Sequence, residues 1–169
     1  MNCNRFLLGC WAVIVSGCAS YNLGPTNGVV AGSRSIQIVP FVNKATEPRL
    51  SEALTLALRK QVQQDGTYRL DTSGAGDVLL SGTIVRFERE ELSFQPSDVL
   101  TVRDYHLVMV AEIKATDAAT GQTLLQRPIG GRTSIRVGAD LTSAERQAIP
   151  LLAADVARNA VALLVDGSW

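Results

Sequence analysis

The side chains best suited to acid–base chemistry in this 169-residue chain are one histidine and a group of carboxylates. His106 is the only histidine, and Glu88, Glu90 and Glu91 stand close together in the sequence. A histidine serves as a general base in hydrolases when a serine or cysteine nucleophile lies within hydrogen-bond reach. No such residue stands in an evident triad arrangement with His106, and two arginines interleave with the carboxylates. We therefore expect no enzyme, and interpret the charges as cross-strand ion pairs on an exposed sheet face.

Phosphate-loop and metal chemistry are poorly supported as well. The segment Gly74-Ala75-Gly76 is not followed by a helical pattern, so it does not match a glycine-rich phosphate loop. A metal centre needs ligands at defined spacings, which one histidine does not supply. We expect neither a metal ion nor a diffusible cofactor.

The strongest candidate for a ligand site is basic. Arg103 begins one predicted strand, and Arg132 and Arg136 lie on the irregular strand that should pair with it. Guanidinium groups bind phosphate through paired hydrogen bonds, so this group could hold a phosphorylated ligand. Alternatively, these are ordinary solubilising arginines that face Asp and Glu. A nucleic-acid partner is not expected, because 16 basic and 16 acidic residues balance and the sequence pI is about 6.6.

The N-terminus has the layout of a secretory signal. Arg5 precedes an apolar run over residues 6–15, which is too short for a stable membrane span. The run closes with Val15-Ser16-Gly17-Cys18, which resembles a bacterial lipobox, in which the cysteine is acylated and becomes the first mature residue. The alternative is an ordinary cleaved signal followed by a chance cysteine.

Three segments follow from this interpretation. Residues 1–17 are the predicted signal peptide, residues 18–34 a lipidated tether, and residues 35–169 a single domain. The lipid on Cys18 is the only covalent group expected, because the other two cysteines leave with the signal. No Asp follows Cys18 at the next two positions, and by resemblance to the enterobacterial sorting pattern the anchor should lie in the periplasmic leaflet of the outer membrane.

Two stretches have helical periodicity. Apolar residues recur every three or four positions over residues 49–65, and Gly66 should end that helix. Residues 142–145 (Thr-Ser-Ala-Glu) match a capping box at the start of a second apolar stripe, which ends at Gly167. Pro150 lies inside the second stretch, so we expect a kink or a restarted helix there.

Alternating apolar and polar residues predict strands between and around these helices. The predicted strands cover residues 35–42, 68–70, 77–91, 103–117 and 122–136, and a loop of about ten residues covers 92–101. Pro128 and Gly130-Gly131 suit an edge strand or a bulge better than the centre of a sheet. This order predicts a two-layer α+β sandwich, in which two helices pack on one face of a mainly antiparallel sheet of four or five strands. Within 77–91, strict alternation puts Val85 with Phe87 on one face and Ile84 on the other.

Five short motifs, in this order, resemble the LPS-assembly lipoprotein (LptE) family. They are the lipobox followed by Tyr21-Asn22-Leu23-Gly24, SIQIVPFVNKATEPRL at 35–50, DVLLSGTI at 77–84, RDYHL at 103–107 and DAATG at 117–121. The resemblance covers roughly residues 18–165. It implies a two-helix, four-stranded sandwich that plugs and supports the LptD β-barrel at the outer membrane. It also implies contact with lipopolysaccharide during delivery to the outer leaflet.

One departure and one alternative accompany this resemblance. In the family a basic residue in the central hairpin loop helps to bind lipopolysaccharide, whereas the matching loop here, residues 93–102, carries Asp98 and no Lys or Arg. Arg132 and Arg136 are the residues that could substitute. The first strand and its helix also resemble modules of other envelope machines, such as peptidoglycan-synthase activators and curli-secretion subunits. The long hairpin region and the DAATG turn favour the LptE family.

Overall fold

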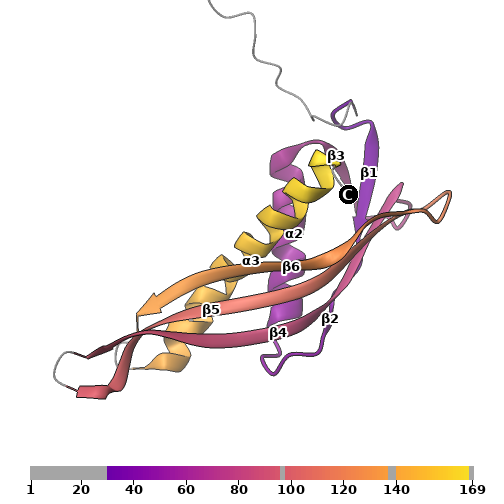
Figure 1. Ribbon diagram of the computed structural model, residues 1–169. Coiled ribbons are helices and arrows are strands. Elements are labelled where there is room, and N and C mark those ends of the chain that lie inside the picture. Colours follow the sequence, from indigo (N-terminus) through magenta and orange to yellow (C-terminus); the bar gives the residue numbers. More distant parts are fainter. Residues whose placement is uncertain (1–29, 96–97, 137–139, 168–169) are drawn as a thin grey trace, which may run out of the picture.

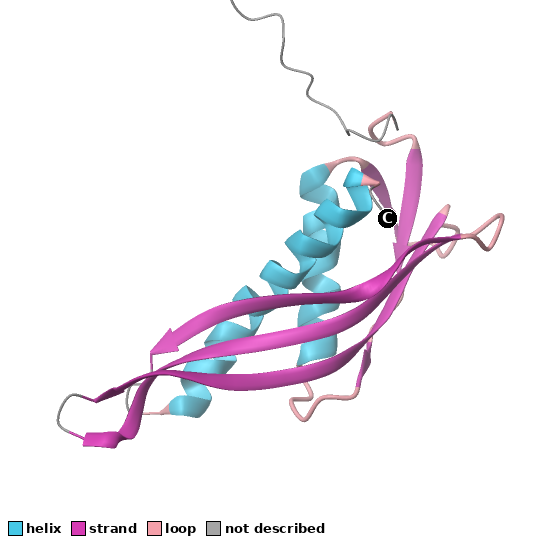
Figure 2. Ribbon diagram, viewed as in Figure 1, coloured by secondary structure: helices cyan, strands magenta, loops and turns pink. Residues whose placement is uncertain are grey.

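In the part of the chain that the structure describes, two helices lie on one face of a six-stranded sheet (Figure 1, Figure 2). This computed structural model describes residues 30–95, 98–136 and 140–167. The expected two-layer α+β sandwich is confirmed, with one strand more than predicted. The predicted signal peptide, residues 1–17, and Cys18 lie outside the described residues.

The sheet combines a parallel part with a long antiparallel meander. Its strands are β1 (Arg34–Ile38), β2 (Val42–Asn43), β3 (Tyr68–Asp71), β4 (Val78–Gln95), β5 (Asp98–Asp117) and β6 (Thr123–Arg136). The strand order is β3-β1-β4-β5-β6, and β2 also pairs with β4. Strand β1 runs parallel to both β3 and β4, whereas β4, β5 and β6 are antiparallel neighbours. As predicted from Pro128, β6 forms an edge of the sheet.

The stretch predicted as one strand, residues 35–42, is divided in two. Pro40 stands between β1 and β2, and proline has no N–H to donate to a strand ladder. Phe41 turns into the core there and is only 3% exposed. Its ring lies against Gly82, where an added Cβ would come within 2.5 Å of the ring. The break therefore adds a core residue at the cost of a continuous strand.

Helix α2 (Leu50–Asp65) forms as its periodicity predicts. The apolar residues that recur along it face the sheet and are fully or almost fully buried: Leu50, Leu54, Leu58 and Val62. Gly66 follows in the left-handed conformation with φ 76°, which a glycine adopts without strain. The prediction of this helix and its end is confirmed.

Helix α3 (Leu141–Asp166) begins differently from the prediction. Its N-cap is Asp140, whose carboxylate accepts hydrogen bonds from the backbone N–H groups of Thr142 and Ser143. The predicted capping box at 142–145 is therefore wrong. Glu145 instead points to the sheet, where it is almost buried and forms a two-point ion pair with Arg89.

Helix α3 runs without interruption through Pro150, so the predicted restart is not found. The helix is long and apolar enough to cross a membrane, but half of its most apolar stretch is buried in the protein. It packs so closely on β6 that a Cβ added to Gly131 would lie 2.7 Å from the backbone nitrogen of Val156. We therefore assign α3 as a core helix, and its close packing on the sheet depends on Gly131.

Two features of the β4–β5 hairpin differ from the predictions. Ile84 pairs with Ala111 and Arg86 with Val110, so Val85 is an extra, unpaired residue. This bulge puts Ile84 and Phe87 on the same, helix-facing side, which strict alternation had separated. The predicted loop at 92–101 is also wrong, because the strands continue to Gln95 and from Asp98, extending the hairpin past the helices (Figure 1).

Candidate functional site

The helices leave one side of β4, β5 and β6 uncovered, and we call this side the open face (Figure 2). It is defined by the side chains that alternate away from the helix layer: Arg86, Glu88, Glu90, Asp104, His106, Val108, Val110, Glu112, Arg132, Ser134 and Arg136. Because strand residues recur at about 3.3 Å, these side chains extend over roughly 26 Å along β5, from Asp104 to Glu112, within a 20-residue strand that is roughly 65 Å long. The open face is therefore an extended, mixed polar and apolar surface.

Two of the predicted phosphate-binding arginines share the open face. Arg132 pairs with Val108 and Arg136 with Asp104 across β5 and β6. They stand four residues apart on one strand, which corresponds to roughly 13 Å. Arg103 belongs to β5 beside Asp104, and its side chain lies outside the described part of the chain. Arg132 and Arg136 thus stand apart along the strand and do not form one compact cluster.

Several charges on the open face are already paired. The Arg136 Nε donates to Asp104 Oδ1 over 3.0 Å, which is the cross-strand arrangement that the alternative interpretation expected. The nearest atoms of Arg86 and Glu88 are 3.5 Å apart, but these residues are neighbours on one strand. Both arginines are at least half exposed, so each pair contributes only a few tenths of a kcal/mol up to about 1 kcal/mol.

His106 has a serine neighbour that the sequence analysis missed. The Oγ of Ser134 lies 3.0 Å from the Nδ1 of His106, and Glu90 pairs with His106 from the other side. Counting equal steps outward from the turn at 117–121 would have paired His106 with Arg132, because the register shift between Ala115 and Thr116 is not visible in the sequence. Ser134 and Glu90 are both exposed, so the group lacks the water-excluded pocket that favours catalysis. We interpret it as a cross-strand hydrogen bond.

Asp77 and Asp117, the first residues of the DVLLSGTI and DAATG motifs, hold together the end of the sheet that lies opposite the tip of the β4–β5 hairpin. Asp77 accepts hydrogen bonds from the backbone N–H and the hydroxyl of Ser35, both over 2.7 Å. Asp117 accepts from the backbone N–H of Thr120 over 2.9 Å and from the Arg34 guanidinium over 2.5 Å. These contacts join the start of β1 to the start of β4 and to the β5–β6 turn. Both carboxylates are engaged in holding the fold.

These contacts also shift the acidity of both carboxyls. The backbone and side-chain hydrogen bonds from Ser35 lower the pKa of Asp77. The corresponding bonds from Thr120, followed by the contact with Arg34, lower the pKa of Asp117. Hydrogen bonds to the ionised form favour that form. Both groups are therefore held as carboxylates, in a structural role.

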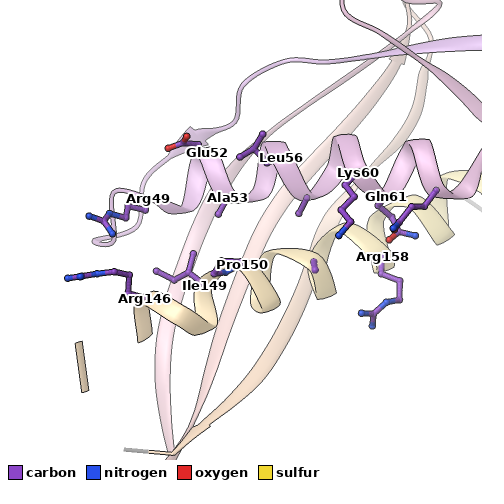
Figure 3. Close-up of a pocket in the computed structure, with 13 residues that line it drawn as sticks. Arg49, Glu52, Ala53, Leu56, Lys60, Gln61, Arg146, Ile149, Pro150 and Arg158 are labelled. Atoms are coloured by element: carbon purple, nitrogen blue, oxygen red, sulfur yellow. The ribbon is translucent and has the colours of Figure 1, made fainter. Parts of the chain in front are cut away.

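A second surface lies on the far side of the helix layer. A groove of about 650 Å³ runs between α2 and α3, and we call it the helix groove (Figure 3). Small and apolar residues line its base, and basic side chains stand along it. Among the described residues, no group of three His, Cys, Asp or Glu side chains is placed to hold a metal ion. The molecule thus offers two broad surfaces of different chemistry.

A helix pair on one side of a sheet and an uncovered opposite side define a two-layer α+β domain. The profile of the LptE family, described as lipopolysaccharide-assembly, matches residues 33–164. Because this match covers most of the chain, the protein belongs to the LptE family. Membership implies the role of a lipopolysaccharide-assembly lipoprotein, and the family is non-catalytic.

Solved structures share the fold at low sequence identity. A protein from Xanthomonas campestris is 12% identical with a TM-score of 0.59, and the match covers 85% of this chain and 91% of that one. A hypothetical protein from Chlamydia trachomatis is 10% identical with a TM-score of 0.56, covering 79% and 95%. Rare lipoprotein B from Shewanella oneidensis is 18% identical with a TM-score of 0.45, and the match covers 76% of this chain and 89% of that one. No curated protein sequence matches the chain.

Proposed function

We propose that this protein plugs and supports an LptD-type outer-membrane β-barrel, without catalysing a reaction, and so assists lipopolysaccharide assembly. The observation that carries the proposal is the open face, in a chain that belongs to the LptE family. Strand β5, which runs through this face, is roughly 65 Å long and exceeds the 40–45 Å thickness of a membrane with its headgroups. A sheet built on a strand of this length can follow a barrel wall through the whole membrane.

The chemistry of the open face supports a protein contact. Val108 and Val110 of the open face are partly exposed, and the ion pairs Arg136–Asp104 and Arg86–Glu88 lie on the same face. Scattered apolar side chains within a polar, charged setting are typical of a non-obligate protein interface. The open face would therefore contact the barrel, while the helix layer supplies rigidity behind it.

The anchor and the ligand contacts are part of the same proposal. Cys18 would carry the lipid that holds the domain on the periplasmic leaflet, after removal of residues 1–17 and with residues 18–34 as a tether. Several acyl chains at about 0.8 kcal/mol per buried CH₂ make detachment very unfavourable. Arg103, Arg132 and Arg136 would each contact a phosphate or carboxylate of passing lipopolysaccharide.

The test is a mild-detergent pull-down of the tagged, full-length protein, with mass spectrometry of what copurifies. We expect a large outer-membrane β-barrel at near 1:1 stoichiometry. Recovery of a cell-wall synthase, or of a ring of identical copies, would instead place the protein in the alternative class of envelope modules. Cys18→Ala should move the protein from the membrane to the soluble fraction, and a membrane-bound variant would contradict the lipoprotein assignment.

A matched pair of variants assigns the barrel contact to one face. Val110→Arg adds bulk and charge in the middle of the open face, where β5 is flanked by β4 and β6. Leu151→Arg adds the same group on α3, where Leu151 is 63% exposed on the helix side. We expect the first variant to lose the barrel and the second to retain it, both with unchanged melting curves. Equal recovery by both variants would exclude the open face as the contact.

A further inference from the structure

The helix groove has a defined length and direction. Arg49 and Arg146 stand together at one end, and both helices run from there in the same direction, towards Lys60 and Arg158 (Figure 3). The lining residues extend from Arg49 to Gln64 on α2, which at 1.5 Å per residue corresponds to roughly 22 Å. That is the length of a helix of about 15 residues.

The base of the groove is apolar and made of small side chains. Ala53 and Ala57 of α2 face Pro150 and Ala154 of α3, and none of these has a long side chain that would fill the space. Leu56 lies along the groove and is 56% exposed. Small residues at a helix surface let another helix approach closely, and an exposed leucine gives it an apolar anchor.

The charges along the groove are predominantly positive. Of the 13 lining residues four are Lys or Arg and one, Glu52, is acidic. Arg158 is bound to Asp155 over 2.9 Å, one helical turn away. In the described part of the chain, Arg49, Lys60 and Arg146 form no salt bridge. On the open face, by comparison, two of the three arginines, Arg86 and Arg136, lie in ion pairs.

The chain itself does not supply a complementary segment. Residues 19–33 contain no Asp or Glu. A second copy presenting the same groove would place cations against cations. The Gly32 N–H donates to the Thr67 carbonyl over 2.9 Å, just beyond the C-terminal end of α2, so the tether reaches the domain at the end opposite Arg49 and Arg146. The described start of the chain therefore lies away from the arginine end of the groove.

We propose that the helix groove binds an acidic amphipathic helix of about 15 residues from a partner protein. Apolar residues of that helix at positions i, i+4 and i+7 would lie on the alanine base, and its carboxylates would face Arg49, Lys60 and Arg146. This site is separate from the open face and goes beyond the proposed barrel contact. The protein would thus bind two partners from opposite sides.

The test is photocrosslinking in cells with the full-length anchored protein, using benzoylphenylalanine at Leu56 or at Gln61. We expect an adduct with a protein other than the barrel. Its crosslinked peptide should be rich in Asp and Glu and have apolar residues at helical spacing. Charge reversal by Arg49→Glu with Arg146→Glu should reduce the adduct at least tenfold, because like charges would then face each other. Arg127→Glu, an exposed reversal on β6 outside the groove, should leave it unchanged.

The outcomes separate this proposal from the barrel contact. A circular-dichroism melt confirms that the reversed protein is folded, and Lys60→Glu serves as a second reversal if it is not. Adducts only with lipid, lipopolysaccharide or the barrel, no adduct from either position, or an adduct insensitive to charge reversal would overturn the proposal. Barrel recovery in the pull-down should be unchanged by the double reversal, so failure at one surface is distinguishable from failure at the other.

Discussion

The open face and the helix groove are built on opposite sides of one core, and their charges are arranged differently. On the open face, Arg136 is bound to Asp104 and Arg86 lies beside Glu88. In the helix groove, Arg49, Lys60 and Arg146 form no salt bridge with any described residue. The open face sets basic and acidic side chains side by side, with two of its three arginines in ion pairs, whereas the predominantly cationic helix groove favours an anionic partner.

The largest effect should come from damage to the core that supports both surfaces. Leu54 is completely buried, so Leu54→Asp would bury an unpaired carboxyl and destabilise the fold by about 3–5 kcal/mol. Leu56→Asp on the same helix is the matched control, because Leu56 is exposed and the change should stay within about 0.5 kcal/mol. Urea unfolding followed by circular dichroism measures both. Unchanged stability of Leu54→Asp would show that α2 does not face the sheet as described.

The close packing of α3 on β6 fixes the position of the helix groove relative to the open face. In Gly131→Ala the new Cβ would meet the Val156 backbone at 2.7 Å, so the helix must shift, at a cost of about 1–3 kcal/mol. Gly130→Ala is the control, since its nearest new contact is an ordinary 3.7 Å. Thermal melting of the two variants should differ clearly. Equal melting temperatures would contradict the close approach of α3.

The ion pair between Arg89 of the sheet and Glu145 of α3 should contribute less to the free energy of unfolding than the buried core residues. Arg89→Ala removes the two-point partner of the nearly buried Glu145, and we expect a loss of about 1–2 kcal/mol, reduced because the Arg89 side chain is half exposed. Arg86→Ala removes only the exposed 3.5 Å pair with Glu88 and should cost less than about 0.5 kcal/mol. Parallel urea titrations compare them. Similar losses in the two variants would mean that the Arg89–Glu145 pair stabilises the fold no more than the exposed Arg86–Glu88 pair does.

The smallest expected effect is on the pH dependence of stability, through Asp77 and Asp117. The hydrogen bonds that lower the pKa of Asp77 and Asp117 favour the folded state when both groups are ionised. This stability should be fully present above about pH 4, where unfolded aspartates are ionised, and be lost as the pH falls through the lower folded values. Asp77→Asn should flatten the acid limb of a plot of urea midpoint against pH. An unaltered acid limb would contradict the role of Asp77.

The sequence predicted what depends on local patterns. The repeat of leucines in α2, the glycine after it and the turn at 117–121 are properties of neighbouring residues, and all three were found. The two-layer architecture follows from the order of such elements. The family resemblance, which rested on motifs in sequence order, agrees with the match over residues 33–164.

What the sequence did not predict depends on contacts between distant residues. Nothing local marks Val85 as a bulge, because the extra residue exists only relative to β5. The hydrogen bond between His106 and Ser134 likewise depends on strand register. Glu145 satisfies the local pattern of a capping box, but its pairing with Arg89 and the earlier cap at Asp140 override that pattern. The helix groove was missed because two helices 76 residues or more apart in sequence form it together.

The position of β1 has a mechanical consequence. The chain enters the domain through Arg34, and β1 is hydrogen-bonded on both sides, to β3 and to β4, in parallel register. A pull along the preceding segment therefore acts in shear on two ladders at once, with their hydrogen bonds loaded together. An edge strand such as β6 would be peeled away one bond at a time. Force arriving from the N-terminal side thus meets the sheet where its resistance to extension is greatest.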